Sequence, residues 1–292
     1  MKTLFLIDAN SLIHRAFHAL PPFTSPDGRP TGALYGISNI LLKILREQKP
    51  DYIAAAFDRP EPTFRDKEYR EYKATRPETA EGLIPQIIGA RELFSLLGIK
   101  TLEMPGFEAD DIIMTLANKF NQEDLRVVIF SGDLDILQAV RGENIVAQIP
   151  KTGISNTVIY NKEAVQDRFG VPPEKLADFK GLVGDKSDNI PGVRGVGPKT
   201  AAVLVMQYGS LENLFQEIEE LGETKATKKL SGSKEIALLS KKLALLREDV
   251  PIKVDLEDFK RVNLNIPKIK EYFIQLGFKT VVDRLAAGYT DN

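Results

Sequence analysis

The sequence has no cysteine and only two histidines among its 292 residues, His14 and His18. The absence of cysteine excludes disulfide bonds, thiolate catalysis and cysteine-ligated metals, and it fits a cytoplasmic protein. The two histidines are four residues apart, but the glutamate of the metalloprotease motif does not stand between them. We therefore expect His14 and His18 to be partly exposed helix residues rather than zinc ligands.

Long apolar runs and an excess of one charge are missing as well. No apolar stretch approaches the ~18 residues of a membrane span, and the apolar part of the N-terminus is too short for a signal peptide. The 39 basic and 41 acidic residues leave a net charge of −2. A nucleic-acid partner must therefore be sought in how the charge is distributed.

Short apolar runs alternate with helical patterns over about the first 150 residues. The runs predict strands over 3–8, 52–58, 99–104 and 126–135, and a hairpin over 145–160 that turns at Lys151-Thr152-Gly153. Helices are predicted over 31–48, 77–98 and 108–121, and the pattern is mostly helical from about residue 161. This order predicts an α/β fold with a mainly parallel central sheet flanked by helices.

Acidic residues gather where these elements begin and end. Three predicted strands run into Asp8, Asp58 and Asp133, and one predicted helix opens with "EADD". The carboxyl ends of parallel strands share one edge of a sheet, so these acids should meet there. Like charges ~4 Å apart repel by about 1 kcal/mol even in water. The cluster must therefore be partly protonated or hold cations, although each strand-end aspartate taken singly could be a turn residue.

Oxygen ligands without histidine or cysteine select hard cations such as Mg²⁺ or Mn²⁺. Two such ions ~3.5–4 Å apart can hydrolyse a phosphodiester.

A later stretch, "GDKSDNIPGVRGVGPKT", adds Asp185 and Asp188. It lacks the spacing of a calcium loop, and Pro198 argues against a P-loop. Two glycines followed by Pro198 predict a tight turn between two helices. Amides of that turn could hold a phosphate beside Lys199, or the turn could be an ordinary helical hairpin.

Basic residues are concentrated in "RPEPTFRDKEYREYKATRP". On a helix, Arg65, Tyr69, Lys73 and Arg76 would share one face, which suits phosphate neutralisation and base stacking. Interleaved acids leave open a solvated, salt-bridged helix. A second basic stretch, residues 224–242, could contact duplex backbone or form a soluble surface around a loop at Gly232 and Ser233.

Taken together, these segments resemble one family nearly end to end. The motifs "FLIDANSLIHRAFHAL", "AAFDRPEPTFRDKEYREYKATRP", "GFEADDII", "SGDLDILQ" and "GDKSDNIPGVRGVGPKTA" are similar to those of the 5′-nuclease domain of bacterial DNA polymerase I, in the flap endonuclease superfamily. The resemblance implies an α/β catalytic core over 1–170 with a basic helical arch at about 59–90. It implies a helical DNA-binding subdomain over 171–292, with a helix-hairpin-helix at about 180–206.

The resemblance also implies roles for individual residues. Two or more divalent ions, Mg²⁺ with Mn²⁺ as a substitute, would be held by Asp8, Asp58, Glu108, Asp110, Asp111, Asp133, Asp135, Asp185 and Asp188. Lys73 and Arg76 would join Asp8, Asp110 and Asp133 as catalytic residues. DNA would be contacted by Arg15, Arg65, Tyr69, Lys73, Arg76, Gly192, Val193, Gly195, Gly197 and Lys199, and K⁺ would bind at the helix-hairpin-helix.

The implied substrates are DNA ends with a 5′ flap, nick or overhang, including RNA-primed ends, in replication and repair. The implied product end is a 5′-phosphate, and a monomer is expected. Leu134 departs from the lysine that is usual between the two aspartates, and the polymerase region is absent from this chain. Two other readings stay open: a haloacid-dehalogenase-like phosphatase, from "SGDLD", and a DNA-binding protein without catalysis.

Overall fold

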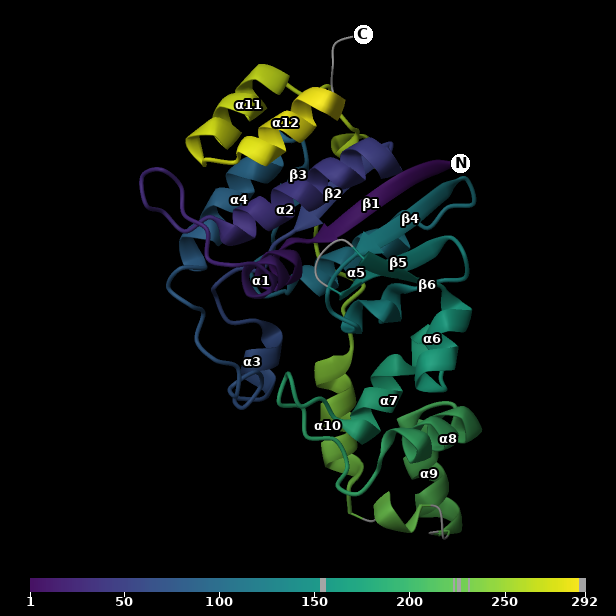
Figure 1. The fold of residues 1–292 in the computed structure, drawn as a ribbon. Helices are drawn as coiled ribbons and strands as arrows, with labels where there is room; N and C mark the ends of the chain where they lie inside the picture. Colours follow the sequence, from purple (N-terminus) through teal and green to yellow (C-terminus); the bar gives the residue numbers. More distant parts are fainter. Residues whose placement is uncertain (153–155, 223, 225–226, 231, 289–292) are drawn as a thin grey trace.

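The computed structural model describes the chain apart from residues 153–155, 223, 225–226, 231 and 289–292. A six-stranded sheet runs through its centre in the order β3-β2-β1-β4-β5-β6 (Figure 1). The strands are β1 (Lys2–Asp8), β2 (Tyr52–Ala56), β3 (Lys100–Leu102), β4 (Leu125–Phe130), β5 (Ile145–Thr152) and β6 (Asn156–Tyr160). Neighbours pair in parallel except β5 and β6, which are antiparallel. The predicted α/β fold is confirmed, and Gly153 of the expected hairpin turn lies outside the described residues.

The central strand β1 is buried on both faces, which explains its unbroken apolar sequence. Leu4 and Leu6 join the hydrophobic core on one face of the sheet. Phe5 and Ile7 join the core on the other face. Side chains alternate along a strand, so this one run of residues contributes to both cores.

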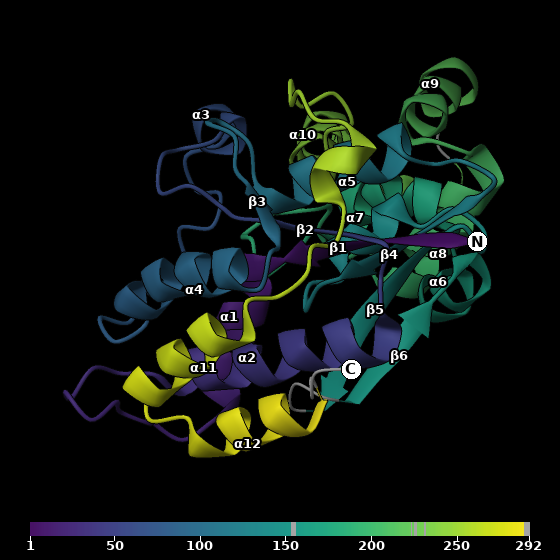
Figure 2. The same ribbon diagram turned by 90° about the horizontal axis from the view of Figure 1, so that it is seen from above.

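Helices from both ends of the chain cover the face that Phe5 and Ile7 meet (Figures 1 and 2). They are α1 (Ala9–Ala19), α2 (Gly32–Lys43), α4 (Ile84–Leu96), α11 (Ile266–Gln275) and α12 (Lys279–Gly288). Phe273 and Val281 are fully buried in this core. The sequence resemblance assigns residues 171–292 to a helical subdomain, whereas the apolar side chains of α11 and α12 pack into the core on the Phe5 and Ile7 face of the sheet.

The other face carries α5 (Ala109–Lys119) and leads into the helical part of the chain. That part contains α6 (Lys162–Phe169), α7 (Leu176–Val183), α8 (Pro198–Tyr208), α9 (Leu211–Leu221) and α10 (Lys234–Ala244). Short helical turns accompany them: η2 (Asp135–Ala139), η3 (Pro173–Lys175), η4 (Lys228–Leu230) and η5 (Leu256–Phe259). One hydrophobic core runs from β1 through α5 to α9. Within the described residues, no helix is long and apolar enough to cross a membrane.

The basic segment near residue 65 differs from the single helix that its spacing predicts. Only α3 (Phe64–Glu68) is helical, and Tyr69 already has extended backbone. Turns follow, and Lys73 adopts a left-handed conformation with φ of 54°. The reason is a tertiary contact: the Lys73 N–H donates to the carbonyl oxygen of Asp188 at 2.9 Å. By contrast, the helix predicted over 31–48 is formed by α2 together with the π-helical turn η1 (Ile44–Gln48) that continues it.

Candidate active site

Four aspartates from separate segments meet at the carboxyl edge of the sheet. Asp8 is the last residue of β1, Asp58 follows β2, Asp133 follows β4, and Asp110 lies in the first turn of α5. The four line one cavity of about 280 Å³. The remaining residues of its wall are Asn10, Ser11, His14, Lys73, Arg76, Glu108 and Ala109.

Local hydrogen bonds fix two of these carboxylates. Asp8 caps α1, accepting a hydrogen bond from the Ser11 N–H at 3.0 Å, and the Ser131 hydroxyl donates to its second oxygen at 2.7 Å. Asp58 accepts from the Ala109 N–H at 2.8 Å, which joins the end of β2 to the start of α5. The strand ends and helix starts therefore hold the acids in place before any ligand binds.

These acids carry more charge than their surroundings neutralise. Burial, followed by repulsion from Asp58, raises the pKa of Asp8 to about 7. Burial, followed by repulsion from Asp8 and Asp133, raises the pKa of Asp110 well above its usual range. The Oδ1 atom of Asp110 is buried and has no hydrogen-bond partner among the described residues. An unpaired, buried carboxylate oxygen beside three other aspartates fits a hard divalent cation.

Within the described residues, no three acidic or histidine side chains already converge as ligands of one ion. Ions would therefore be held partly through water or after small side-chain rotations. His14 borders the cavity, and burial, followed by the charges of His18 and Arg76, lowers its pKa. A neutral His14 at pH 7 adds no counter-charge to the aspartates.

Asp111 and Arg65 do not belong to this cavity. Arg65 is 1% exposed and Asp111 is fully buried, and the guanidinium donates two hydrogen bonds of 2.8 Å to the carboxylate. Arg65 also donates to the carbonyl oxygens of Leu243 and Leu245, and the N–H groups of Glu108 and Arg247 donate to Asp111. The predictions of Asp111 as a metal ligand and of Arg65 as a phosphate contact are therefore corrected, because both side chains are buried and their polar atoms are hydrogen-bonded within the protein.

Glu108 and Asp188 face the basic segment that follows α3. Lys73 Nζ donates to Glu108 Oε1 at 2.7 Å, and Arg76 Nη2 donates to Asp188 Oδ1 at 2.5 Å. The Tyr72 hydroxyl lies between the two acids, 3.2 Å from Glu108 Oε2 and 3.1 Å from Asp188 Oδ2. The two predicted catalytic cations thus reach the cavity wall, but they are paired with two predicted metal ligands.

Asp135 and Asp185 are bridged by a lysine. Lys180 Nζ donates to Asp185 Oδ2 at 2.6 Å and also contacts Asp135 Oδ1. Burial raises the pKa of Asp135 to about 7, because it outweighs the charge of Lys180. Burial is also the largest influence on Asp185, but Lys180 and the hydrogen bonds from Ser187 together outweigh it and lower the pKa to about 2. The three side chains border a second cavity of about 680 Å³, which Asp133 also lines.

The loop between α7 and α8 has the predicted form, because α8 begins at Pro198. Gly195 has a φ of +83°, and space is open around a Cβ built at Gly195 or Gly197. The Gly192 N–H, however, donates to the Ser240 hydroxyl, and the Val193 N–H donates to the Leu182 carbonyl oxygen. The prediction that Gly192 and Val193 contact DNA is corrected, whereas exposed Gly195, Gly197 and Lys199 stay candidates.

The other two predicted DNA contacts lie at the edge of this region. Tyr69 packs against the small apolar cluster of Tyr72, Ile190, Leu243 and Ala244, so its ring is partly covered. Arg15 on α1 lies against Gly132, beside the aspartate cavity.

Sequence reasoning missed three residues that shape the site: Ser131, Tyr72 and Lys180. Ser131 is fully buried between Asp8, to which it donates, and the Asp133 N–H, from which it accepts at 3.0 Å. Tyr72 adjoins Lys73 in "YKATR". Lys180 is a basic residue in the mainly apolar segment "DFKGLV", and this was the available signal.

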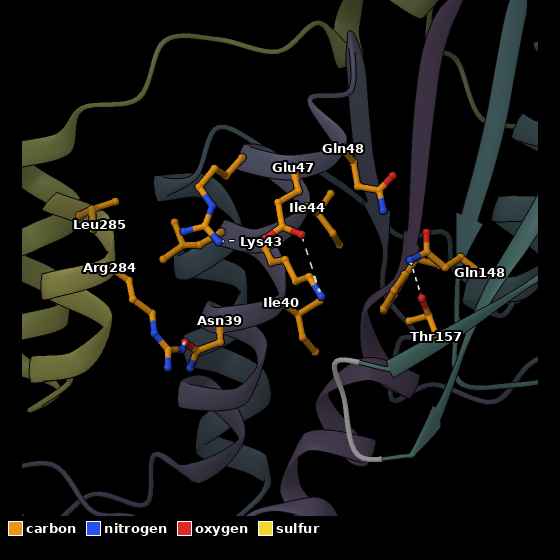
Figure 3. Close-up of a pocket in the computed structure, with 13 residues that line it drawn as sticks. Asn39, Ile40, Lys43, Ile44, Glu47, Gln48, Gln148, Thr157, Arg284 and Leu285 are labelled. Carbon is orange, nitrogen blue, oxygen red and sulfur yellow. Dashed lines mark hydrogen bonds and ion pairs between the residues drawn. The ribbon is translucent and has the colours of Figure 1, made fainter. Parts of the chain in front are cut away.

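A separate cavity of about 390 Å³ lies between α2 with η1, the β5–β6 hairpin and α12 (Figure 3). Lys43, Arg46 and Arg284 line it together with a single acid, Glu47. Gln148 donates to the Thr157 hydroxyl at 2.9 Å on its hairpin side. Its lining has no cluster of acids, so it lacks the chemistry of the aspartate cavity.

Comparison with known proteins identifies two family regions along the chain. Residues 3–170 match the 5′-3′ exonuclease N-terminal resolvase-like domain, and residues 171–266 match the 5′-3′ exonuclease C-terminal SAM fold. A 5′-3′ exonuclease of Aquifex aeolicus is 40% identical over 97% of this chain and 94% of its own length. DNA polymerase I of Caldicellulosiruptor bescii is 41% identical over 97% of this chain, which spans only 33% of that protein.

Solved structures share the fold at low sequence identity. The T5 D15 protein, co-crystallised with metal ions, is similar with a TM-score of 0.66 at 17% identity, over 98% of this chain and 97% of its own. The catalytic core of Rad2 in complex with a DNA substrate is similar with a TM-score of 0.64 at 17% identity, over 98% of this chain and 92% of its own.

Proposed function

The chain belongs to the 5′-3′ exonuclease family, and we propose that it is a structure-specific 5′ nuclease that hydrolyses phosphodiester bonds at the 5′ ends and flaps of duplex DNA. The observation that carries this proposal is the cavity of Asp8, Asp58, Asp110 and Asp133. Buried carboxylates from separate segments repel one another unless cations join them.

Two divalent ions, Mg²⁺ or in its place Mn²⁺, would activate water and stabilise the attacking and leaving oxygens of the phosphodiester. Asp8, Asp58, Asp110 and Asp133 would hold the first ion, and Asp135 and Asp185, which line a cavity that Asp133 also borders, would hold the second. Glu108 and Asp188 would lie at the outer edge, where they pair with Lys73 and Arg76. Until cations bind, protons on Asp8 and Asp110 relieve the repulsion, because the pKa of each is raised.

The chain's own cations orient the substrate. Lys73 and Arg76 reach the cavity wall, and each can exchange its carboxylate partner for a phosphate oxygen of the bound strand. A phosphate of the duplex would be held near the start of α8, by Lys199 and by the backbone at Gly195 and Gly197. K⁺ would bind at the same turn. Two separate phosphate contacts would fix the distance between duplex and cleavage point, and so give structure specificity.

The proposed substrates are DNA ends with a 5′ flap, nick or overhang, including RNA-primed ends, and the product end is a 5′-phosphate. We place the activity in replication and repair in the cytoplasm, with the chain acting as a monomer. The DNA polymerase I relatives support a polymerase region as its covalent partner.

A labelled 5′-flap duplex, titrated with Mg²⁺, tests the proposal. We expect cutting near the flap junction with Mg²⁺ and an intact duplex in EDTA. Rapid turnover of a small phosphomonoester, with flap DNA untouched, would instead support the phosphatase reading. Tight flap binding without cutting in any divalent metal would support the binding-protein reading.

A further inference from the structure

Lys180 bridges Asp135 and Asp185, two acids that the sequence resemblance assigns to metal binding. Its Nζ donates to Asp185 Oδ2 at 2.6 Å and contacts Asp135 Oδ1. The three side chains are only 14%, 15% and 18% exposed for Lys180, Asp135 and Asp185, so the ammonium is largely shielded from water. An ammonium between two shielded carboxylates supplies the neutralisation that a metal ion would otherwise supply.

Hydrogen bonds fix the backbone of both acids, whereas the side chain of the lysine is long and flexible. Asp185 pairs with Ile190 through two backbone hydrogen bonds, its N–H donating at 2.8 Å and its carbonyl oxygen accepting at 2.7 Å. The Asp135 N–H donates to Asp133 Oδ1 at 2.9 Å at the start of η2. Lys180 reaches them from α7 on a flexible four-carbon chain. If an ion enters, Lys180 is the member of the trio that must move.

The turn after α7 keeps the trio together. Gly184 has a φ of +74°, and a Cβ there would lie 2.5 Å from the Ile190 carbonyl oxygen, so only glycine fits. Lys180 itself lies in the last turn of α7, where the helix dipole also favours a cation. An ion that displaces the ammonium must therefore replace its favourable interactions with two acids and with the helix end.

The aspartate cavity differs in this respect. Asp110 keeps an unpartnered buried oxygen there, within the described residues, and Asp8 is bonded to the Ser131 hydroxyl and the Ser11 N–H. Lys180 and Lys186 are the basic residues that line the second cavity, and Leu134 beside them is apolar. Binding at Asp135 and Asp185 thus begins with displacement of a built-in cation, and binding at Asp110 does not.

We propose that Lys180 is a positioning residue that acts as a built-in competitor for the second divalent ion, so that the Asp8–Asp110–Asp133 side fills first and the Asp135–Asp185 side fills only at higher metal concentration. The apparent affinity of a site falls by the fraction of protein in which that site is closed. The inference rests on the proposed function for its meaning, because it concerns the ions of the nuclease reaction.

Mn²⁺ binding to the full chain, followed by the electron paramagnetic resonance signal of the free ion, tests the proposal without DNA. In Lys180→Met, we expect the weaker binding constant to tighten by about tenfold or more, the size that loss of a charge-assisted competitor implies. Lys186→Met is the matched control: it removes the same charge from the same cavity lining and should leave both constants within twofold of wild type. A weaker constant that is unchanged or loosened in Lys180→Met would overturn the proposal.

A second measurement uses the wild-type chain, in case Lys180→Met folds poorly. The ¹⁵N-ammonium NMR signal of a shielded, bridged lysine should be visible without metal, and Lys180→Arg should remove it for assignment. We expect this signal to vanish as Mg²⁺ fills the weaker site. A signal that persists through saturation would overturn the proposal, whereas failure to cut flap DNA would overturn the proposed function without changing either metal titration.

Discussion

Asp110 and Asp111 are neighbours in the first turn of α5, yet their surroundings are opposite. Asp110 opens into a cavity of four aspartates, and its Oδ1 has no partner among the described residues. Asp111 points into the protein, where Arg65 and two backbone N–H groups take both of its oxygens. An acid whose two oxygens are both paired stabilises the fold. An acid with an unpaired oxygen in a buried cavity is instead stabilised when a cation binds there. The same residue type, one position apart, thus separates scaffold from chemistry.

Asparagine at position 110 gives the largest expected loss of activity. We expect Asp110→Asn to lower flap cleavage by about a thousandfold, the scale on which loss of a preorganised electrostatic group acts. Folding and flap binding should persist, because the substitution removes a charge that repels Asp8 and Asp133. Single-turnover cleavage and binding assays measure the two effects. Asp133→Asn should behave in the same way, and near-normal cutting by either variant would remove that carboxylate from the catalytic set.

Asparagine at position 111 should act on stability instead. Asp111→Asn leaves the Arg65 guanidinium buried without its countercharge, which costs about 3–5 kcal/mol of unfolding free energy. Urea unfolding of the metal-free chain measures this loss, with Asp110→Asn as the matched control. If both variants unfolded at the same urea concentration, the contrast between the two neighbours would be broken.

This contrast also marks how far the sequence alone could lead. The parallel sheet and the meeting of Asp8, Asp58, Asp110 and Asp133 follow from strand ends and helix starts, which apolar runs reveal. The pairing of Arg65 with Asp111 depends on two side chains 46 positions apart, and their identities do not reveal which way each side chain points. The prediction that the helix continues beyond α3 was wrong for a similar reason. The Lys73 N–H donates to the Asp188 carbonyl oxygen, and the spacing of residues in the sequence does not reveal such a long-range contact.

A pH series on the metal-free chain sharpens the comparison further. Asp8 and Asp135 have pKa values of about 7 in the folded state against an ordinary 3.8, so the folded chain binds more protons than the unfolded chain between about pH 4 and 7. The stability they contribute is therefore fully present below about pH 4 and is lost as the pH rises through 7. We expect the metal-free Tm to fall by roughly 3 °C or more from pH 6 to pH 8.

Saturating Mg²⁺ should remove most of that fall, because the ion replaces the proton between the acids. Differential scanning calorimetry with EDTA or Mg²⁺ measures both curves. Asp110→Asn should flatten the EDTA curve. A metal-free Tm that rises from pH 6 to 8 would contradict the charge surplus in the cavity.

Lys73 tests the smallest of the expected effects on cleavage. Lys73→Ala should lower flap cleavage by about ten- to a hundredfold and reduce the salt slope of binding by about one phosphate contact. Lys67→Ala is the matched control, since Lys67 lies on the exposed side of α3. Cleavage rates and binding constants over a series of KCl concentrations give both numbers. If the salt dependence of binding were the same for Lys73→Ala and Lys67→Ala, Lys73 would not contact a DNA phosphate and would act only as the ion-pair partner of Glu108.

The dry contact between Arg65 and Asp111 has a practical consequence at the bench. Dissolved ions weaken attractions that water can reach, but they do not enter a contact that the protein has sealed. Concentrated KCl should therefore dissociate bound nucleic acid from this chain. The buried contact that links α3, α5 and the end of α10 should persist, so the protein can be purified free of nucleic acid without unfolding.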